Sequence, residues 1–469
     1  MNIYKINIEL KQITPMLHFQ GNETEATLRA TELKPKLDRF ILAWIAYENN
    51  NITWDQKALD VENQMFKNCL KELTKTHENW FIDPKSEKIA LNYKVRIIPG
   101  TPKTMNVFVQ VPKNNKNNSS MVTEYYGNAG YVLRQKDNKF QSKYHETITI
   151  LIKCFDQDLN NKIIELFPLF MDTTAFGFQQ GKGYGNFTIN KINDLKLNPS
   201  CKENMVKVVN HFNSKDEKNL LLYELDYTSM TYDKSYDDYI NNHGGLGTAL
   251  DAIAQYNHIL KSGLNLKNTG VYLESILLKK YFKEGQRKQL LNEKKVMKAY
   301  LESNGVRLKN YYHESENLKD TQLNDAKYMR GFFGFAQEYV FLDNDNHRNS
   351  VSLKATYRNG RDNVEISRVP SPLSYHIDYF VGNDGYNDCK IYILVDLSIV
   401  KRLKKLNPDI FFKYKNSRNG FKAKMAPFDM EDFFEYALKQ QVSFKEKDRK
   451  ISTVPTEKSY KLKRIEGVK

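Results

Sequence analysis

The alternation of hydrophobic and polar residues predicts a series of strands and helices in the first 200 residues. Strand patterns place every second side chain on one face, and helical patterns repeat apolar residues every three or four positions. The strand patterns cover residues 1–10, 88–98, 147–154 and 187–193, and the helical patterns cover residues 33–48, 55–76 and 158–170. The predicted order is therefore strand, helices, strand, strand, helix, strand.

That order is typical of a ferredoxin-like, or split-βαβ, domain. The second half of the chain repeats it less clearly, with strand patterns at residues 220–228, 351–357, 364–379 and 390–396 and helical patterns at residues 244–260, 272–282 and 430–441. We therefore predict an α+β protein with two ferredoxin-like βαββαβ domains, long insertions and a basic C-terminal tail.

The expected domain boundaries follow from these patterns. Residues 1–215 form the first domain, and residues 216–441 form a divergent second domain with a helical insertion. Residues 442–469 hold nine basic and four acidic side chains, a composition typical of a solvated basic tail.

The net charge favours a polyanionic partner. The 469 residues include 71 Lys and Arg against 56 Asp and Glu, a formal net charge of +15. Such a surplus neutralises phosphates and releases their counterions. Charge alone does not choose between RNA, DNA, an acidic membrane and an acidic protein. The 40% of hydrophobic residues excludes a disordered chain as the overall class.

Several other classes of protein are excluded because their sequence patterns are absent. No apolar run approaches the roughly 18 residues of a membrane-spanning helix. The N-terminus alternates like a strand and lacks the features of a signal peptide. The cysteines are scattered without a C-x-x-C pair, and no two histidines have metal-ligand spacing. We expect a cytoplasmic protein with no membrane segment, no metal and no cofactor.

A glycine-rich segment at residues 181–187 is the clearest candidate binding feature. It follows a predicted helix, so it is not a nucleotide-triphosphate P-loop. Its glycines permit positive φ and a close approach of phosphate to backbone N–H groups. Lys182 adds charge, and Tyr184 offers a face on which a base could stack. The alternative is a tight turn with incidental glycines. The candidate RNA-binding residues are Gly181, Lys182, Gly183, Tyr184 and Gly185.

Basic residues in two other segments extend this candidate surface. Helix N-termini attract phosphates, and arginine or hydroxyl side chains contact a phosphodiester backbone. The loop and first turn of the predicted helix at residues 33–48 contribute Arg29, Lys34, Lys36 and Arg39, and the second half contributes Arg330, Arg368 and Ser371. The alternative for the first group is an ordinary solvated helix face.

The sequence offers only weak candidates for catalytic residues. His18 follows a strand beside basic residues and could act as a general base for RNA cleavage through the 2′-OH, but a lone histidine is more often structural. Asp38 is a second candidate acid, and its neighbours Lys36 and Arg39 favour an ordinary ion-paired carboxylate. We therefore assign no catalytic residue.

Several motifs in sequence order resemble the RAMP superfamily of CRISPR proteins, and more narrowly the first-named subunit of the Cmr (type III-B) effector complex. The matching segments are Thr14-Pro15 with Gly21, Glu32-Leu33-Lys34-Pro35 with Arg39-Phe40 and Trp44, Gly183-Tyr184-Gly185-Asn186, Gly334-Phe335-Ala336, and Pro370-Ser371-Pro372-Leu373. Two positions depart from the family pattern. Lys34 replaces an arginine, which loses bidentate geometry, and Leu37-Asp38 replaces a small residue.

The resemblance implies a non-catalytic RNA-binding subunit of a ribonucleoprotein. In this family the subunit lies near the 3′ end of the CRISPR RNA (crRNA) and helps to capture complementary target RNA. The implied partners are crRNA, target RNA and other RAMP subunits of a type III CRISPR effector complex. Three alternatives stay open. They are a RAMP endoribonuclease acting on crRNA precursor or target RNA, a scaffold that contacts only protein, and the 3′-end subunit of a type III-A (Csm) complex.

Overall fold

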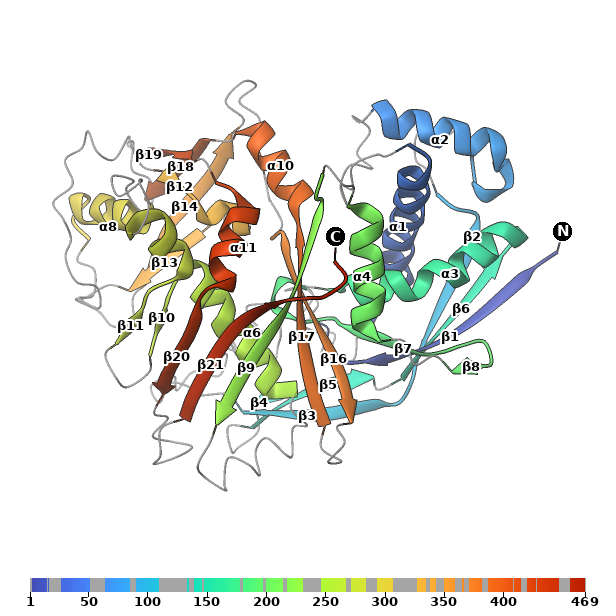
Figure 1. Cartoon of the computed structure of the whole chain (residues 1–469), viewed down its shortest axis with the longest axis horizontal. Coiled ribbons are helices and arrows are strands. Elements are labelled where there is room, and N and C mark those ends of the chain that lie inside the picture. Colours follow the sequence, from blue (N-terminus) through green and yellow to red (C-terminus); the bar gives the residue numbers. More distant parts are fainter. Residues whose placement is uncertain are drawn as a thin grey trace. The chain divides into compact units, whose positions relative to one another are not determined.

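A computed structural model describes most of the chain (Figure 1). The described residues are 2–14, 16, 27–50, 64–84, 90–108, 133–134, 139–145, 147–177, 180–196, 200–213, 217–230, 246–266, 271–283, 293–306, 327–334, 338–342, 350–358, 365–366, 371–381, 387–407, 409–414, 420–426, 428–446 and 456–468. The chain forms two compact units. Unit 1 comprises Met1–Ala254, Ser374–Ser398 and Val442–Lys469, and unit 2 comprises Gln255–Leu373 and Ile399–Gln441.

The first sheet of unit 1 has the ferredoxin-like order. In chain order its elements are β1 (Tyr4–Gln12), α1 (Ala30–Asn50), β2 (Tyr93–Pro99), β6 (Thr147–Cys154), α3 (Gln157–Thr173) and β7 (Phe187–Ile192), with β8 (Leu195–Lys196) at the edge. The strands lie side by side as β2-β6-β1-β7-β8, and all four pairs are antiparallel. The two halves of the βαββαβ pattern therefore interleave in one sheet.

Alternation along β1 explains how this sheet meets its helices. Ile6, Ile8 and Leu10 are at most 1% exposed, and they share a core with α1 and α3. Within α1, Leu37 and Ile41 are fully buried one turn apart, as helical spacing predicts. The sequence patterns at both elements therefore predicted the buried faces.

A second sheet of unit 1 repeats the same order with strands that are far apart in sequence. Its strands are β9 (Leu220–Met230), β16 (Leu373–Val381), β17 (Asn387–Asp396), β20 (Gln441–Glu446) and β21 (Thr456–Arg464), arranged as β16-β17-β9-β21-β20. Counting β9, β16, β17 and β21 as the first to fourth strands gives the order 2-3-1-4, as in the first sheet. The prediction of two ferredoxin-like repeats is confirmed.

A single core joins the two repeats. Helix α4 (Cys201–Phe212) contacts both α3 and β9, and buried residues of β9 and β17 belong to the same cluster as those of the first sheet. Two further helices are α2 (Gln64–Thr76) and α6 (Leu246–Lys261), and two short 3-10 turns are η1 (Glu78–Trp80) and η3 (Gln180–Lys182). A separate three-stranded sheet contains β3 (Pro102–Phe108), β5 (Lys139–His145) and β4 (Leu133–Arg134), in that order.

The C-terminal segment differs from the predicted solvated tail. Strand β21 pairs antiparallel with β9 and is the fourth strand of the second repeat, and β20 flanks it. Tyr460 and Leu462 are 3% and 1% exposed, whereas the alternating Lys461 and Lys463 are exposed. Net charge had suggested a tail, but period-two alternation decides which side chains a strand buries. The second repeat is therefore not confined to residues 216–441.

Unit 2 is formed by the segments that interrupt the second repeat. Its main sheet contains β12 (Lys327–Tyr328), β13 (Glu338–Leu342), β14 (Ser350–Arg358), β15 (Glu365–Ile366), β18 (Asp409–Tyr414) and β19 (Phe421–Met425), in the order β12-β19-β18-β14-β13 with β15 beside β14. Other elements are β10 (Leu264–Asn265), β11 (Tyr272–Leu273), α7 (Ile276–Leu278), η4 (Lys279–Lys283), α8 (Glu293–Ser303), η5 (Arg330–Phe333), α10 (Leu397–Leu406), which begins two residues before unit 2 resumes, and α11 (Met430–Leu438). In the described part of the chain, no helix is long and apolar enough to cross a membrane.

Candidate nucleic-acid interface

Two of the segments selected from the sequence are joined in unit 1, namely the start of α1 and the residues leading into the glycine-rich loop. The Glu32 carboxylate accepts hydrogen bonds from the Gly177 N–H at 2.8 Å and from Lys36 Nζ at 3.1 Å. Lys36 also donates to the Ala175 carbonyl oxygen at 2.9 Å, and its ammonium group lies 4.8 Å from the Phe176 ring centroid. These contacts position the loop against the helix.

Close backbone packing explains two of the loop glycines. Gly183 and Gly185 have φ values of +84° and +75°, in the region that favours glycine. The Phe176 N–H donates to the Gly185 carbonyl oxygen at 2.9 Å. A Cβ at Gly185 would lie 1.8 Å from the Phe176 carbonyl oxygen, so no other residue fits without a backbone shift.

Asn186 connects this loop to both sheets, a role that the sequence analysis did not predict. Its side-chain amide donates to the carbonyl oxygens of Gly183 at 2.8 Å and of Tyr375, in β16, at 3.2 Å. Its N–H donates to Thr14 Oγ1 at 2.9 Å, and its carbonyl oxygen accepts from the Ile13 N–H at 2.9 Å. Because both partners of the amide are backbone atoms, side-chain types in the sequence could not reveal this connection.

The other loop residues differ in their access to a ligand. Tyr184 is only 4% exposed, so its ring packs inside the protein and offers little surface for a base. Lys182 is exposed, although the surrounding protein lowers the pKa of its amine from the ordinary value by desolvation. Gly181 is half-buried. Lys182 is therefore the loop side chain best placed to meet an anion.

Lys34 and Lys36, two of the four predicted cations around α1, contact other segments of the protein. Lys34 pairs with Asp38 at 2.7 Å, donates to the Leu91 carbonyl oxygen at 3.0 Å and lies 4.3 Å from the Tyr93 ring centroid. Lys36 is similarly placed, and burial lowers the pKa of its amine while the Glu32 carboxylate opposes that shift. Both lysines connect α1 to neighbouring segments.

Arg29 and Arg39 differ from these lysines because their side chains are exposed. Arg29, just before α1, and Arg39 within it are thus two exposed arginines near the start of this helix. Arginine forks suit phosphate oxygens because several N–H donors lie in one plane. The sequence alone did not separate these two kinds of cation.

In unit 2, the structure brings together two motifs that lie far apart in the sequence. Gly334, with φ of +102°, follows η5, and a Cβ there would lie 3.1 Å from the Ser371 nitrogen. Ser371 Oγ accepts from the Leu373 N–H at 3.2 Å. Arg330 is half-buried at the start of η5, and Arg368 lies outside the described residues.

The candidate acid is poorly placed for catalysis. Asp38 is 6% exposed, and its Oδ2 accepts from Lys34 Nζ and from the Leu91 N–H. Burial raises the pKa of this carboxyl, and the Lys34 ammonium opposes the shift. The candidate base His18 lies outside the described residues. Among the residues that the structure describes, no three His, Cys, Asp or Glu side chains are grouped to hold a metal ion.

Comparisons with known proteins cover nearly the whole chain. A family model of the Cmr1 N-terminal domain matches residues 3–264, and one of the Cmr1 C-terminal domain matches residues 272–462. None of the curated proteins matches the chain.

Similar solved structures share little sequence with this chain. A chain in a cryo-EM structure of type III-B Cmr-beta bound to cognate target RNA is 14% identical over 41% of this chain and 61% of that chain, less than two thirds of its length, with a TM-score of 0.22. Apo Cmr1 from Pyrococcus furiosus is 12% identical over 57% of this chain and 79% of that chain, with a TM-score of 0.27. Cmr6 from the same organism is 11% identical over 40% of this chain and 98% of that chain, with a TM-score of 0.18.

Proposed function

This chain belongs to the Cmr1 family, and on that premise we propose that it is a non-catalytic RNA-binding subunit of a cytoplasmic type III-B CRISPR effector complex. Family membership makes it a type III-B effector subunit. The proposal adds that it binds RNA near the 3′ end of the crRNA and assists the capture of complementary target RNA. Its partners would be crRNA, target RNA and the other RAMP subunits of the complex.

The observation that carries this proposal is the junction of α1 with the segment leading into the glycine-rich loop. Glu32 and Lys36 connect the two, while Arg29 and Arg39 on one side and Lys182 on the other are exposed. We assign phosphate contacts to the exposed cations and positioning roles to Lys34 and Lys36. The loop backbone at residues 181–185 would shape the surface, and Arg330, Arg368 and Ser371 would contribute in unit 2. Sequence recognition would come from base pairing with the guide RNA.

The RNA-binding assignment can be tested by removing two exposed cations together. Arg39→Ala with Lys182→Ala should weaken binding to a crRNA–target RNA duplex and flatten the dependence of log Kd on log salt by about one to two counterions. Lys75→Ala with Lys445→Ala is the matched control, because these unit 1 lysines are 69% and 70% exposed on other elements. An unchanged affinity and slope in the first variant would refute the assignment.

A second experiment tests the absence of catalysis. Incubation of the purified protein with crRNA precursor or target RNA should leave both intact, with or without divalent metal. The burial of Asp38 and its pairing with Lys34 support this expectation. Metal-independent cleavage that disappears in His18→Ala would replace the proposal with the endoribonuclease alternative.

Purification from native cells tests the assembly. The protein should copurify with mature crRNA and with other Cmr subunits. Csm subunits in their place would reassign the subtype to III-A. If other Cmr subunits copurify but the guide RNA makes no crosslink to this chain, the result would favour the alternative in which the chain is a scaffold that contacts only protein.

A further inference from the structure

The first sheet of unit 1 packs against α1 and α3 with one face, and its opposite face carries many basic side chains. The inward side chains of β1, β2, β6 and β7 share a core with these two helices (Figure 1). Successive side chains of a strand point to opposite faces, so the residues that alternate with the inward ones form the outer face. On three of the strands these outward residues are Lys5, Asn7, Glu9 and Lys11 of β1, Lys94, Arg96 and Ile98 of β2, and Thr147, Thr149, Leu151 and Lys153 of β6.

The strand register aligns four of these cations. Lys5 of β1 and Lys94 of β2 are both paired with Lys153 of β6, so three lysines form one row across three strands. Adjacent strands are about 5 Å apart, and the row therefore spans about 10 Å between the backbones of its two ends. Arg96 lies two residues after Lys94 on the same face, about 7 Å along β2. All four side chains are exposed, and we call them the sheet cations.

The charges of the sheet cations are not compensated by nearby acidic groups. None of the four forms an ion pair or a side-chain hydrogen bond with the residues that the structure describes. The single acid among the outward side chains of β1, β2 and β6 is Glu9, which accepts from Asn190 Nδ2 of β7 and is paired in register with the exposed Lys191. Like charges directly opposite one another on paired strands destabilise a sheet. The row is therefore unfavourable for the fold alone and suits a polyanionic partner.

The composition of this face fits a nucleic acid better than a protein. Interfaces between proteins are depleted in lysine and enriched in aromatic residues, whereas interfaces with nucleic acids are polar and strongly positive. The apolar outward residues of β1, β2 and β6 are the half-buried Leu151 and the 39% exposed Ile98. The sheet cations also have hydrogen-bond donors beside them, Asn7 and Thr149, and side chains of all these types contact phosphate oxygens.

The absence of aromatic side chains on these three strands indicates which form of RNA the face can hold. The four-stranded sheet of an RRM domain binds single-stranded RNA by stacking bases on aromatic residues, and other single-strand-binding surfaces use similar platforms. The outward residues of β1, β2 and β6 offer no such platform. Double-stranded RNA needs none, because its bases are paired inside the helix and proteins recognise it through its shape, its 2′-OH groups and its phosphates.

We propose that the sheet cations hold the phosphate backbone of a crRNA–target RNA duplex, independently of its sequence. The outer face lies across the sheet from α1, so it is a second contact surface of unit 1, distinct from the surface at the start of that helix. This inference rests on the proposed RNA-binding function. It adds a binding surface and the form of RNA that this surface holds.

Removal of two sheet cations from the full-length protein tests the proposal. Lys94→Gln with Lys153→Gln should weaken duplex binding about fivefold to tenfold and reduce the salt slope by about one to two. Duplexes of unrelated sequence should show the same loss, because phosphates carry no sequence information. The unfolding midpoint should equal or exceed that of the wild type, since two like charges in register are removed. The matched control is Lys413→Gln with Lys424→Gln, which removes two exposed lysines from strands β18 and β19 of unit 2.

Chemical modification locates the contact without any substitution. Saturating duplex RNA should protect Lys5, Lys94 and Lys153 of the wild-type protein from acetylation, because their amines would lie against phosphates. Lys413 and Lys424 should stay reactive under the same conditions. Mass spectrometry of proteolytic peptides measures the modification of each lysine, and equal reactivity of the two groups with and without duplex would contradict the proposal.

The other outcomes separate this inference from the proposed function. Unchanged duplex affinity in the Lys94/Lys153 variant, with binding still sensitive to Arg39 and Lys182, would overturn the inference and leave the proposed function intact. A loss of affinity for single-stranded RNA but not for the duplex would also overturn it. Loss of other Cmr subunits from this variant, with normal RNA affinity, would assign the face to a protein partner instead. No RNA binding by the wild-type protein would refute both proposals.

Discussion

Gly183 and Gly185 occupy the same loop, but for different physical reasons. A Cβ at Gly183 would lie 2.6 Å from Ile253 Cδ1, the end of a side chain that can move. At Gly185 it would meet backbone atoms of Phe176, which are held by a hydrogen bond to Gly185 itself. Gly185 is thus required by the close approach of two backbone segments as well as by its positive φ.

Substitution of Gly185 should therefore be far more costly than substitution of another positive-φ glycine. We expect Gly185→Ala to lower the free energy of unfolding by roughly 3 kcal/mol or more. Gly467→Ala is the control in the same unit, since its φ is +84° and the nearest atom to a Cβ is 3.8 Å away. That variant should lose only about 1–2 kcal/mol. Urea unfolding of both variants measures the difference, and equal losses would contradict the packing argument.

Two buried titratable residues of unit 1 have opposite effects on stability. Asp172 is 6% exposed and accepts from Asn204 Nδ2 at 2.6 Å, and burial raises its pKa to about 7. His376 is 2% exposed, and burial lowers its pKa to about 4. Between pH 4 and 7 the folded state holds more protons at Asp172 than the unfolded state does, so this residue makes stability fall as the pH rises. His376 makes stability rise between pH 4 and 6.5, because there the unfolded imidazole binds more protons.

Single substitutions should separate these opposing slopes. Asp172→Asn keeps an acceptor for Asn204, removes the buried carboxyl and should stabilise the protein at pH 8 by up to a few kcal/mol. Its stability should also rise more steeply between pH 4 and 6.5 than that of the wild type, because the opposing contribution of Asp172 is absent. His376→Gln should change the pH dependence in the opposite sense, so that stability rises less steeply than in the wild type between pH 4 and 6.5. Urea unfolding from pH 4 to 8 tests this, and an Asp172→Asn variant that is less stable than wild type at pH 8 would contradict the expected sign.

At the scale of elements, β21 shows how one strand can be both basic and part of a core. Tyr460 and Leu462 point into unit 1, while Lys461 and Lys463 are exposed between and beside them. Lys458 is buried but pairs with Asp251 of α6 at 2.9 Å, which offsets the cost of burying its charge. The strand is therefore attached to the second repeat by its inward face and by one ion pair.

Adjacent substitutions in β21 should have very different effects. Leu462→Ala should lower the free energy of unfolding by about 2–4 kcal/mol, since it removes a fully buried side chain and leaves a cavity. Lys461→Ala, one residue away on the exposed face, should change it by less than about 0.5 kcal/mol. Thermal or urea unfolding measures both. Similar small effects would mean that the strand is not part of the folded core.

At the scale of the whole molecule, the candidate RNA-binding residues belong to different units of one chain. Arg29, Arg39 and Lys182 lie in unit 1, and Arg330 and Ser371 lie in unit 2. The net charge of +15 suits contacts that are distributed over both units.

Much of the fold could be predicted from local patterns. The alternation at Ile6, Ile8 and Leu10 and the helical spacing of Leu37 and Ile41 predicted which faces are buried, because periodicity depends only on neighbours in the chain. The order of these elements then predicted the ferredoxin-like repeat, and ordered motifs predicted the family that the domain matches support.

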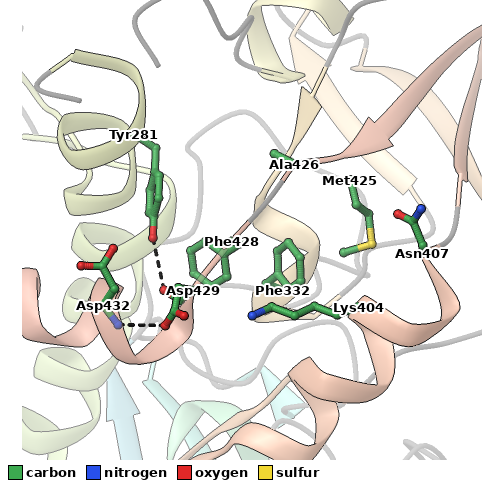
Figure 2. A pocket seen from close by; sticks show the side chains of 9 residues that line it. All are labelled: Tyr281, Phe332, Lys404, Asn407, Met425, Ala426, Phe428, Asp429 and Asp432. Carbon is green, nitrogen blue, oxygen red and sulfur yellow. Dashed lines mark hydrogen bonds between the residues drawn. The ribbon is translucent and has the colours of Figure 1, made fainter. Parts of the chain in front are cut away.

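The remaining features depend on residues that only folding brings together. Strand β21 belongs to the second repeat because β9, more than 200 residues earlier, pairs with it. Lys34 and Lys36 are half-buried and contact Asp38, Glu32 and backbone carbonyl oxygens of other segments, whereas Arg29 and Arg39 are exposed. A pocket in unit 2 is lined by Tyr281, Phe332 and Asp429, which come from three separate stretches of the chain (Figure 2). Sequence alone determined which side chains each element would bury and the sign of the overall charge. Tertiary structure decided which cations stay exposed, because a charge is compensated by whichever groups the fold places within a few ångströms of it.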